Sequence, residues 1–424
     1  MGKLGLGAGT ALVAGNMIGS GIFLLPAGLV VYGRFGLIGW CCAALGALLL
    51  AAVFRRLGMV QPEAPGGPYA YVRRAFGDLL GFVVAWGYWV SIWCTNAAIA
   101  VACVGYLGVF FPALASNAVL AAGTGAGLIV LFTGINSGGV RKMAAVQIAT
   151  TVLKIVPLLA LGLLGLPFIN VDHLLADGTF EGGAFGAITG ATTLTLFAFL
   201  GVESAAISSA RLRDPKRDVG RASILGTLLT TVVYLLGSVA VMGALPPEVL
   251  ANSSAPFAEA AGAFWGASAR PIMAAAAIVA TLGALNGWLF IQGEFPMAAA
   301  DDGLFPAVFA SRNRAGVPFI GIAISSGLAC AVLLLNFSDS LVDTFTFMMT
   351  LSTLSTLVPF LLSSLALRQF LRGQTDENGG RILGLVTAMF CGWVILGCGW
   401  EVLLYGGILL TVGLILFGCR SALK

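Results

Sequence analysis

The sequence predicts an all-α integral membrane protein with twelve transmembrane helices. Three observations predict this fold class: 59% of the 424 residues are hydrophobic, only 9% are charged, and the apolar residues fall into long runs. Soluble domains carry about a quarter charged residues, so this chain has too few polar side chains to cover a water-soluble globule. The composition therefore excludes a soluble enzyme, a nucleic-acid-binding protein and a disordered protein.

Twelve apolar runs divide the chain, and a span takes about 20 residues. The runs lie at 5–31, 36–54, 79–111, 117–134, 145–169, 185–209, 222–245, 272–298, 317–336, 343–367, 382–399 and 402–419. If the chain starts in the cytoplasm, 19 of the 22 Lys and Arg residues fall on the cytoplasmic side. This bias is the positive-inside pattern, so we expect a multi-pass protein in contact with membrane lipid, with both termini cytoplasmic.

The cysteines and the single histidine indicate no metal or disulfide chemistry. All eight cysteines lie in or beside apolar runs, and His173 lies in a polar loop. We therefore expect no disulfide framework, no metal site and no cofactor. The sequence has no Walker loop, which excludes ATP-driven transport by this chain alone. The N-terminus lacks a cleavage-type signal, so the first span is expected to remain as an anchor.

Residues 15–21 (GNMIGSG) place three glycines and two polar residues inside the first span. Glycine destabilises a helix interior by about 1 kcal/mol, and unwound backbone is tolerated in a membrane only where it faces protein or a cavity. We therefore predict a break near Ile18 that presents backbone amides. The alternative is close helix packing through the small residues.

Residues 197–204 (FAFLGVES) interrupt the sixth span in the same way, because Gly201 and Glu203 lie within an apolar run. Spans one and six are five apart, which favours two five-span units related by inverted symmetry, with the broken helices crossing at the midplane. The predicted repeats are 1–169 and 185–367, followed by two accessory spans in 382–424.

Three ionisable residues lie deep within spans, where charge is expensive and usually functional. Glu203 is the candidate proton site, because burial penalises its charged form; its alternative is a neutral acid that bridges two backbones. Lys154 could act as a fixed cation in place of sodium, carry the coupling proton, or extend to the cytoplasmic interface. Glu294 could pair with Lys154 or face a water-filled vestibule.

Five segments resemble motifs of the amino acid–polyamine–organocation superfamily, in the same order and over nearly the whole chain. The nearest branch is that of the bacterial basic amino acid/polyamine antiporters, with a LeuT-like fold. The matching segments are 16–21, 65–71 (PGGPYAY), 199–204, 214–217 (DPKR) and 299–306 (AADDGLFP). The resemblance implies a transporter, not an enzyme, in the bacterial inner membrane; homodimerisation is left open.

The resemblance also implies roles for particular residues. The first break would hold the substrate carboxylate and amine, Phe197 and Tyr88 would act as gates, Asn96 would face a guanidinium, and Trp288 would form a wall. The implied substrate-binding residues are Asn16, Met17, Ile18, Ser20, Gly21, Tyr88, Asn96, Phe197, Leu200, Trp288 and Ser352. Glu203, Lys154 and Glu294 are the candidates for proton coupling.

Two departures from the family pattern bear on the substrate. Phe197 stands where arginine exchangers have tryptophan, and Lys154 stands at a position that is apolar in those exchangers. We therefore predict a sodium-independent secondary amino acid transporter that exchanges an amino acid, with cationic ones favoured, for another amino acid or its decarboxylated amine. The alternatives are a proton-coupled symporter of neutral amino acids and, more distantly, an ion channel, although the sequence carries no filter repeat.

Overall fold

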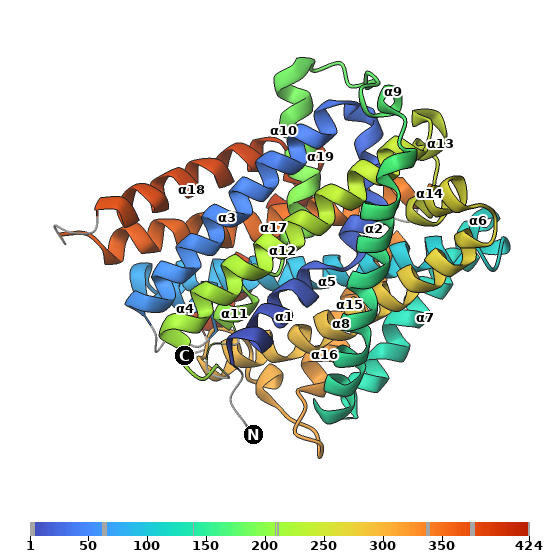
Figure 1. The fold of residues 1–424 in the computed structure, drawn as a ribbon. Helices are drawn as coiled ribbons and strands as arrows, with labels where there is room; N and C mark the ends of the chain where they lie inside the picture. Colours follow the sequence, from blue (N-terminus) through green and yellow to red (C-terminus); the bar gives the residue numbers. More distant parts are fainter. Residues whose placement is uncertain are drawn as a thin grey trace.

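The computed structural model describes residues 5–61, 66–138, 140–207, 209, 212–335, 340–373 and 378–422. Within these ranges the chain is helical and contains no β-strand. Figure 1 shows long helices that cross one another in a single bundle. The all-α fold predicted from composition is therefore confirmed.

The first half of the chain forms helices joined by short connections. They are α1 (Leu6–Met17), α2 (Ser20–Leu29), η1 (Val30–Tyr32), α3 (Phe35–Val60), α4 (Pro68–Phe76), α5 (Asp78–Leu107), α6 (Ala113–Ser116), α7 (Ala118–Ser137), α8 (Val140–Leu164), η2 (Leu166–Phe168) and α9 (Val171–Leu174).

The second half continues the same pattern. Its elements are α10 (Gly183–Leu196), η3 (Phe197–Phe199), α11 (Ser204–Ile207), α12 (Pro215–Ala244), α13 (Pro247–Ala251), α14 (Pro256–Trp265), α15 (Ala269–Asp301), η5 (Ala307–Ala310), α16 (Phe319–Leu335), α17 (Leu341–Phe370), α18 (Asn378–Leu396) and α19 (Trp400–Ala422).

Ten helical segments in the described part of the chain are long and apolar enough to cross a membrane. Two shorter apolar stretches, Leu153–Leu164 in α8 and Phe319–Leu335 in α16, lie where the sequence predicts spans five and nine. The structure therefore indicates a multi-pass membrane protein. The count of twelve spans and the division at 1–169, 185–367 and 382–424 remain predictions.

Local chemistry sets several helix ends. The side chains of Asn117, Asp214 and Ser340 accept hydrogen bonds from backbone N–H groups in the first turns of α7, α12 and α17. Pro215 follows Asp214 at the first position of α12, where its missing N–H leaves no bond unmade. These caps satisfy backbone groups that the helix itself cannot satisfy.

Helix α5 forms the centre of the bundle, packed against α15 and α17, while α3 packs against α10 and α12. In the most apolar part of α5, 94% of the residues are buried, against 11% in α19. Helix α19 exposes Leu404, Ile408 and Ile415. An outer helix with this apolar surface is expected to face lipid acyl chains rather than water.

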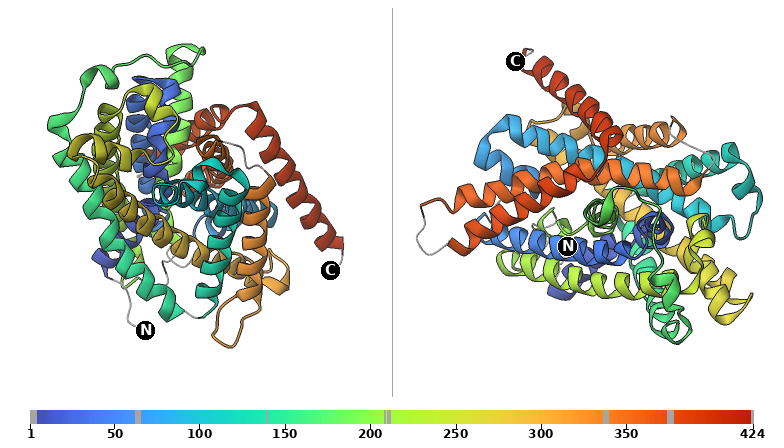
Figure 2. Two further views of the ribbon diagram at one scale, coloured as in Figure 1. Left: turned by 90° about the vertical axis from the view of Figure 1, so that its right-hand side faces the viewer. Right: turned by 90° about the horizontal axis from the view of Figure 1, so that it is seen from above.

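The start of α1, the end of α19 and the connection from α15 to α16 lie in the lower half of Figure 1 and of the left view in Figure 2. The connection from α9 to α10 lies at the opposite, upper end in both views. The two helices that the sequence predicts to be broken are therefore held inside the bundle, between these two ends.

Candidate functional site

The first span is broken where the glycines predict it. Helix α1 ends at Met17 and α2 begins at Ser20, and between them Ile18 and Gly19 have extended or irregular backbone. A Cβ on Gly19 would lie 3.0 Å from the Cβ of Ala284 on α15. A side chain at position 19 would therefore push against Ala284, and α15 would have to move by a few tenths of an ångström.

Side chains of other helices bind the carbonyl groups that the break leaves at the end of α1. The last carbonyls of a helix have no intrahelical partner. Three donors from three helices take their place: Lys154 Nζ on α8 bonds Gly15 (3.0 Å), Trp288 Nε1 on α15 bonds Asn16 (3.3 Å), and Tyr234 Oη on α12 bonds Met17 (2.5 Å). The end of α1 is thus held by hydrogen bonds from α8, α12 and α15.

The sixth span is broken at Leu200–Glu203, between the short helices η3 and α11. Gly201 has a φ of +113°, a conformation that L-residues rarely adopt, and a Cβ there would lie 3.2 Å from Asn16. The amide of Asn16 donates to the hydroxyl of Ser204 at 2.9 Å, and Tyr234 Oη also bonds the Ala198 carbonyl at 3.0 Å. The two breaks therefore touch and share a partner.

A small cavity, lined only by buried residues, lies between the two breaks, α5 and α15. Its volume of about 10 Å³ is room for about one water molecule, so a larger ligand requires the walls to move apart. Its lining residues are Asn16, Met17, Gly19, Ser20, Gly21, Thr95, Ile99, Phe197, Ala198, Leu200 and Trp288.

Seven of the eleven residues predicted to bind substrate line this cavity, and four do not: Ile18, Tyr88, Asn96 and Ser352. Ser352 does not line the cavity, but its hydroxyl oxygen is 2.7 Å from that of Thr95, which does. Thr95 and Ile99 were not predicted, because they are ordinary residues of an apolar helix that carries no motif at these positions. Gly19 and Ala198 lie inside the predicted break segments but were not selected.

Glu203 and Tyr88 form a buried pair beside the second break, with 0% and 1% of their surfaces exposed. Tyr88 donates its hydroxyl proton to Glu203 Oε1, and the backbone N–H of Gly201 donates to Oε2 at 3.2 Å. Both carboxyl oxygens therefore act as acceptors in this arrangement. A protonated Glu203 would gain one O–H donor while keeping acceptor capacity, and the Tyr88 oxygen is an adjacent group able to accept from it.

Lys154 is buried, with 1% of its surface exposed, and its ammonium donates to the Gly15 carbonyl. It does not extend to the interface, as one alternative from the sequence required. Glu294 lies on α15 and is half-buried. The roles of Lys154 and Glu294 in proton coupling remain predictions.

Helix α4 contacts the end of α15 through a cluster of polar and aromatic side chains. Tyr69 donates to Asp302 at 3.0 Å, and Arg73 donates to the Asp302 carbonyl and, at 2.7 Å, to Asp78. Burial and the adjacent Asp302 carboxylate raise the pKa of Tyr69, so its hydroxyl remains a donor. The Tyr69 ring packs edge-on against Phe295, as part of the same contact.

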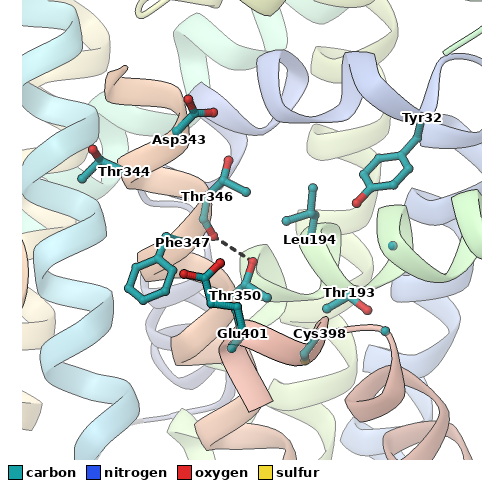
Figure 3. A pocket seen from close by; sticks show the side chains of 13 residues that line it. Tyr32, Thr193, Leu194, Asp343, Thr344, Thr346, Phe347, Thr350, Cys398 and Glu401 are labelled. Carbon is teal, nitrogen blue, oxygen red and sulfur yellow. Dashed lines mark hydrogen bonds between the residues drawn. The ribbon is translucent and has the colours of Figure 1, made fainter. Parts of the chain in front are cut away.

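A larger cavity of about 500 Å³ lies between η1, α10, α17 and the start of α19. Figure 3 shows Asp343 and Glu401 on its walls together with the hydroxyls of several threonines. Phe197, which lines the small cavity, packs edge-on against Phe345 of α17, at a centroid distance of 6.1 Å. Sequence reasoning missed this cavity, because its polar groups come from helix ends that are far apart in the chain.

Within the described ranges, no group of three or more His, Cys, Asp or Glu residues is arranged to hold a metal ion. The seven cysteines whose placement is described are free thiols. The small cavity and its surroundings offer hydrogen-bonding groups, aromatic rings and the buried side chains of Lys154 and Glu203.

Comparison with known proteins agrees with this architecture. The chain matches the amino acid permease family model over residues 4–413. A protein of Bacillus subtilis (strain 168), provisionally named an arginine/ornithine antiporter, is 34% identical, and the match covers 96% of this chain and 94% of the relative. The cadaverine/lysine antiporter of Escherichia coli (strain K12) is 33% identical over 93% of this chain and 90% of the relative.

The arginine/ornithine antiporter of Pseudomonas aeruginosa (strain PAO1) is 32% identical over 98% of this chain and 90% of its own length. These full-length matches support the branch predicted from the motifs. The chain belongs to the amino acid permease family, within the amino acid–polyamine–organocation superfamily.

Proposed function

We propose that the protein is a sodium-independent secondary transporter that works by alternating access. It would exchange a cationic amino acid for another amino acid or for its decarboxylated amine. The observation that carries this proposal is the small buried cavity between two broken helices, with the polar side chains of Asn16, Ser20 and Thr95 on its wall. Full-length relatives named as antiporters of arginine, ornithine, lysine and cadaverine support the choice of substrate class.

The start of α2 is suited to a substrate carboxylate. No side chain in the described part of the chain caps this helix at Gly19, and Ser20 and Gly21 line the cavity. The free N–H groups and the positive end of the helix dipole both favour a negative charge at this position. The aromatic ring of Trp288 and the ring of Phe197 would then cover the bound ligand.

Glu203 and Lys154 would make transport depend on protons rather than on sodium. A proton on Glu203 adds a donor and removes a negative charge beside Tyr88 and Gly201, which would change the contact between the second break and α5. The Lys154 ammonium holds the Gly15 carbonyl at the end of α1, which is a place where a bound cation could act. A fixed ammonium there would make a sodium ion unnecessary.

The proposal includes a membrane topology. Twelve spans, with 1–169 and 185–367 as inverted repeats and 382–424 as accessory spans, would place both termini in the cytoplasm and the protein in the bacterial inner membrane. The distribution of Lys and Arg supports this orientation. The start of α1 and the end of α19 lie at the same end of the bundle, which agrees with it.

A second candidate is proton-coupled symport of neutral amino acids. The buried Lys154 and the phenylalanine at position 197 favour it, because a cationic substrate would gain less from Phe197 than from a larger ring. The two candidates differ in what drives net uptake.

Counterflow into proteoliposomes tests the proposal. We expect uptake of labelled lysine or arginine to be stimulated by internal ornithine, cadaverine or putrescine, and to be unchanged when sodium is replaced by choline. Empty vesicles with a pH gradient provide the comparison, because net uptake of a neutral amino acid there would favour the symporter. Absence of stimulation from the opposite side by every amino acid and amine would remove the exchange mechanism.

A further inference from the structure

One face of α12 joins two arginines to a row of apolar side chains. Arg217, Arg221, Leu225, Leu228 and Val232 follow one another at intervals of three or four residues, so they share one face of the helix. We call these five residues the α12 stripe. All five are exposed, the three apolar ones by 46%, 44% and 54%. The stripe is therefore left largely uncovered by the part of the chain that the structure describes.

Arg55, near the end of α3, lies beside the charged end of the α12 stripe. The two helices cross so closely that a Cβ on Gly220 would lie 2.9 Å from the Cα of Arg55. Gly220 directly precedes Arg221, and Arg55 is exposed as well. Figure 1 shows α3 and α12 side by side, and the yellow-green α12 runs along one edge of the bundle in the right view of Figure 2.

The ends of α3 and α12 that meet here carry an excess of positive charge. Residues 55–61 and 212–221 contain two acidic residues, Asp214 and Asp218, and six basic ones. Asp214 accepts a hydrogen bond from the backbone N–H of Arg217, and its carboxylate lies 3.9 Å from the Arg217 guanidinium. The acids offset only part of the charge of the basic residues, which are Arg55, Arg56, Arg213, Lys216, Arg217 and Arg221.

The order of charged and apolar residues along the α12 stripe matches that of a phospholipid leaflet. A helix rises about 1.5 Å per residue, so Arg221 and Arg217 lie about 6 and 12 Å before Leu225, and the apolar part to Val232 is about 10 Å long. Half of a hydrocarbon core is about 15 Å thick. Guanidinium groups bind phosphate oxygens through paired hydrogen bonds. The stripe can therefore hold a phosphate at one end and an acyl chain beyond it.

We propose that Arg55, Arg217 and Arg221 bind the phosphate group of an anionic phospholipid, whose acyl chain lies along the apolar part of the α12 stripe. A zwitterionic phospholipid binds less tightly, because its own cationic group offsets the charge of its phosphate. The inference goes beyond the proposed exchange function, since it concerns a lipid and not the transported substrate.

The opposite face of α12 connects this lipid site to the two breaks. A Cβ on Gly226 would lie 2.8 Å from the Cβ of Val13 on α1, so α12 and α1 are closely packed. Farther along α12, Tyr234 bonds the Met17 and Ala198 carbonyls. A lipid that binds the folded protein stabilises it by mass action, and here it does so through the helix that holds both breaks.

Binding of labelled lipid to the full-length protein in an uncharged detergent tests the proposal. The probe is fluorescent dioleoylphosphatidylglycerol, compared with dioleoylphosphatidylcholine that carries the same label. In the triple variant Arg55→Gln, Arg217→Gln, Arg221→Gln we expect the affinity for phosphatidylglycerol to fall at least about tenfold. The affinity for phosphatidylcholine should not change. The rise in thermal stability that phosphatidylglycerol gives the wild type should disappear.

The matched control removes the same charge from three other exposed arginines, in the variant Arg314→Gln, Arg368→Gln, Arg372→Gln. At about 0.15 M salt distant charges are screened, so its affinity for phosphatidylglycerol should stay within about twofold of the wild-type value. Equal losses in the two triple variants would show that overall charge attracts the lipid, and would overturn the proposal. Equal affinity of the wild type for the two lipids would also overturn it.

Competition on the wild-type protein keeps the test valid if the first triple variant fails to fold. Unlabelled phosphatidylglycerol should displace the probe, whereas inorganic phosphate and glycerophosphoglycerol, which lack acyl chains, should not do so at matched ionic strength. Displacement by inorganic phosphate at similar concentrations would show a site for free anions and would overturn the proposal. Because no transport is measured, the outcome is independent of the proposed exchange function.

Discussion

At the scale of single residues, the Glu203–Tyr88 pair is the group that we propose to make exchange depend on protons. Replacing Glu203 by Gln keeps the shape and an acceptor for Tyr88 but removes the group that gains a proton. We expect the dependence of exchange on pH to become flat in Glu203→Gln, because glutamine cannot gain a proton. Initial rates in proteoliposomes at matched internal and external pH provide the measurement.

Glu401→Gln is the control for this experiment, because Glu401 lines the larger cavity and lies outside the small one. Its pH profile should match that of the wild type. A pH profile in Glu203→Gln that equals the wild-type profile would contradict the proton role of Glu203.

A second prediction concerns the side chain of Lys154 and the dependence of exchange on sodium. Lys154→Met removes the ammonium from the Gly15 carbonyl and leaves that buried acceptor without its partner. We expect exchange to fall at least about tenfold, with no restoration by sodium. Uptake with and without sodium measures this, and strict sodium dependence of the wild type would be the contrary result.

The sequence revealed those residues that break a pattern and missed those that do not. Asn16 was recognisable because it is polar among glycines inside an apolar run, and Trp288 because it follows Asn286-Gly287 in a span. Thr95 and Tyr234 carry no such mark, yet one lines the cavity and the other bonds both breaks. Their positions follow from how α5 and α12 pack, which the order of residues alone does not encode.

At the scale of helices, the two breaks need particular backbone conformations. Gly201 shows this for the second break. Its φ of +113° is a conformation that disfavours a side chain by roughly 1–2 kcal/mol. A Cβ would also approach Asn16 and Met17 to 3.2 Å. Gly201→Ala should therefore lower both the thermal stability in detergent and the exchange rate.

Gly392→Ala on α18 is the control, because a Cβ there meets no atom within 4 Å. It should leave exchange unchanged and stability unchanged or slightly higher. Equal behaviour of the two variants would mean that the second break tolerates ordinary helical backbone.

The places of both breaks were predictable, because glycine and charge inside an apolar span have a clear physical cost. The helix ends were less so. The apolar run at 36–54 stops at Arg55, but α3 continues to Val60, because long basic side chains extend from a helix end toward water without disturbing its backbone.

At the scale of the whole molecule, we expect the contact between α4 and the end of α15 to keep the proposed cytoplasmic side closed. Tyr69→Phe removes the hydrogen bond to Asp302 but keeps the ring against Phe295. We expect the proposed cytoplasmic side to open more often. Ala206 lies buried in α11, beside the second break. Reaction of Ala206→Cys with a membrane-impermeant reagent, in a background without the native cysteines, should then be several-fold faster.

Tyr71→Phe, on the same helix, removes a buried hydroxyl that is not part of this contact. Its labelling rate should equal that of the parent protein. If Tyr69→Phe also labels at the parent rate, this contact does not hold the cytoplasmic side closed.

The membrane character of the molecule was predictable from composition alone, since too few polar residues are present to cover it. The larger cavity was not, because its walls come from η1, α10, α17 and α19, which only the packed bundle brings together. The predicted orientation and span count come from the distribution of Lys and Arg and from hydropathy.

The three hydrogen-bond donors at the end of α1 disfavour intermediate positions of this helix between its bonded and its released state. Lys154, Trp288 and Tyr234 belong to three helices, so a rotation that carries the carbonyls of Gly15, Asn16 and Met17 away from their partners releases all three bonds. Their sum is roughly 3 to 6 kcal/mol, which makes a half-turned helix rarer than the bonded state by roughly a hundredfold or more. Movement of this helix should therefore be all-or-none, and substrate must supply the difference.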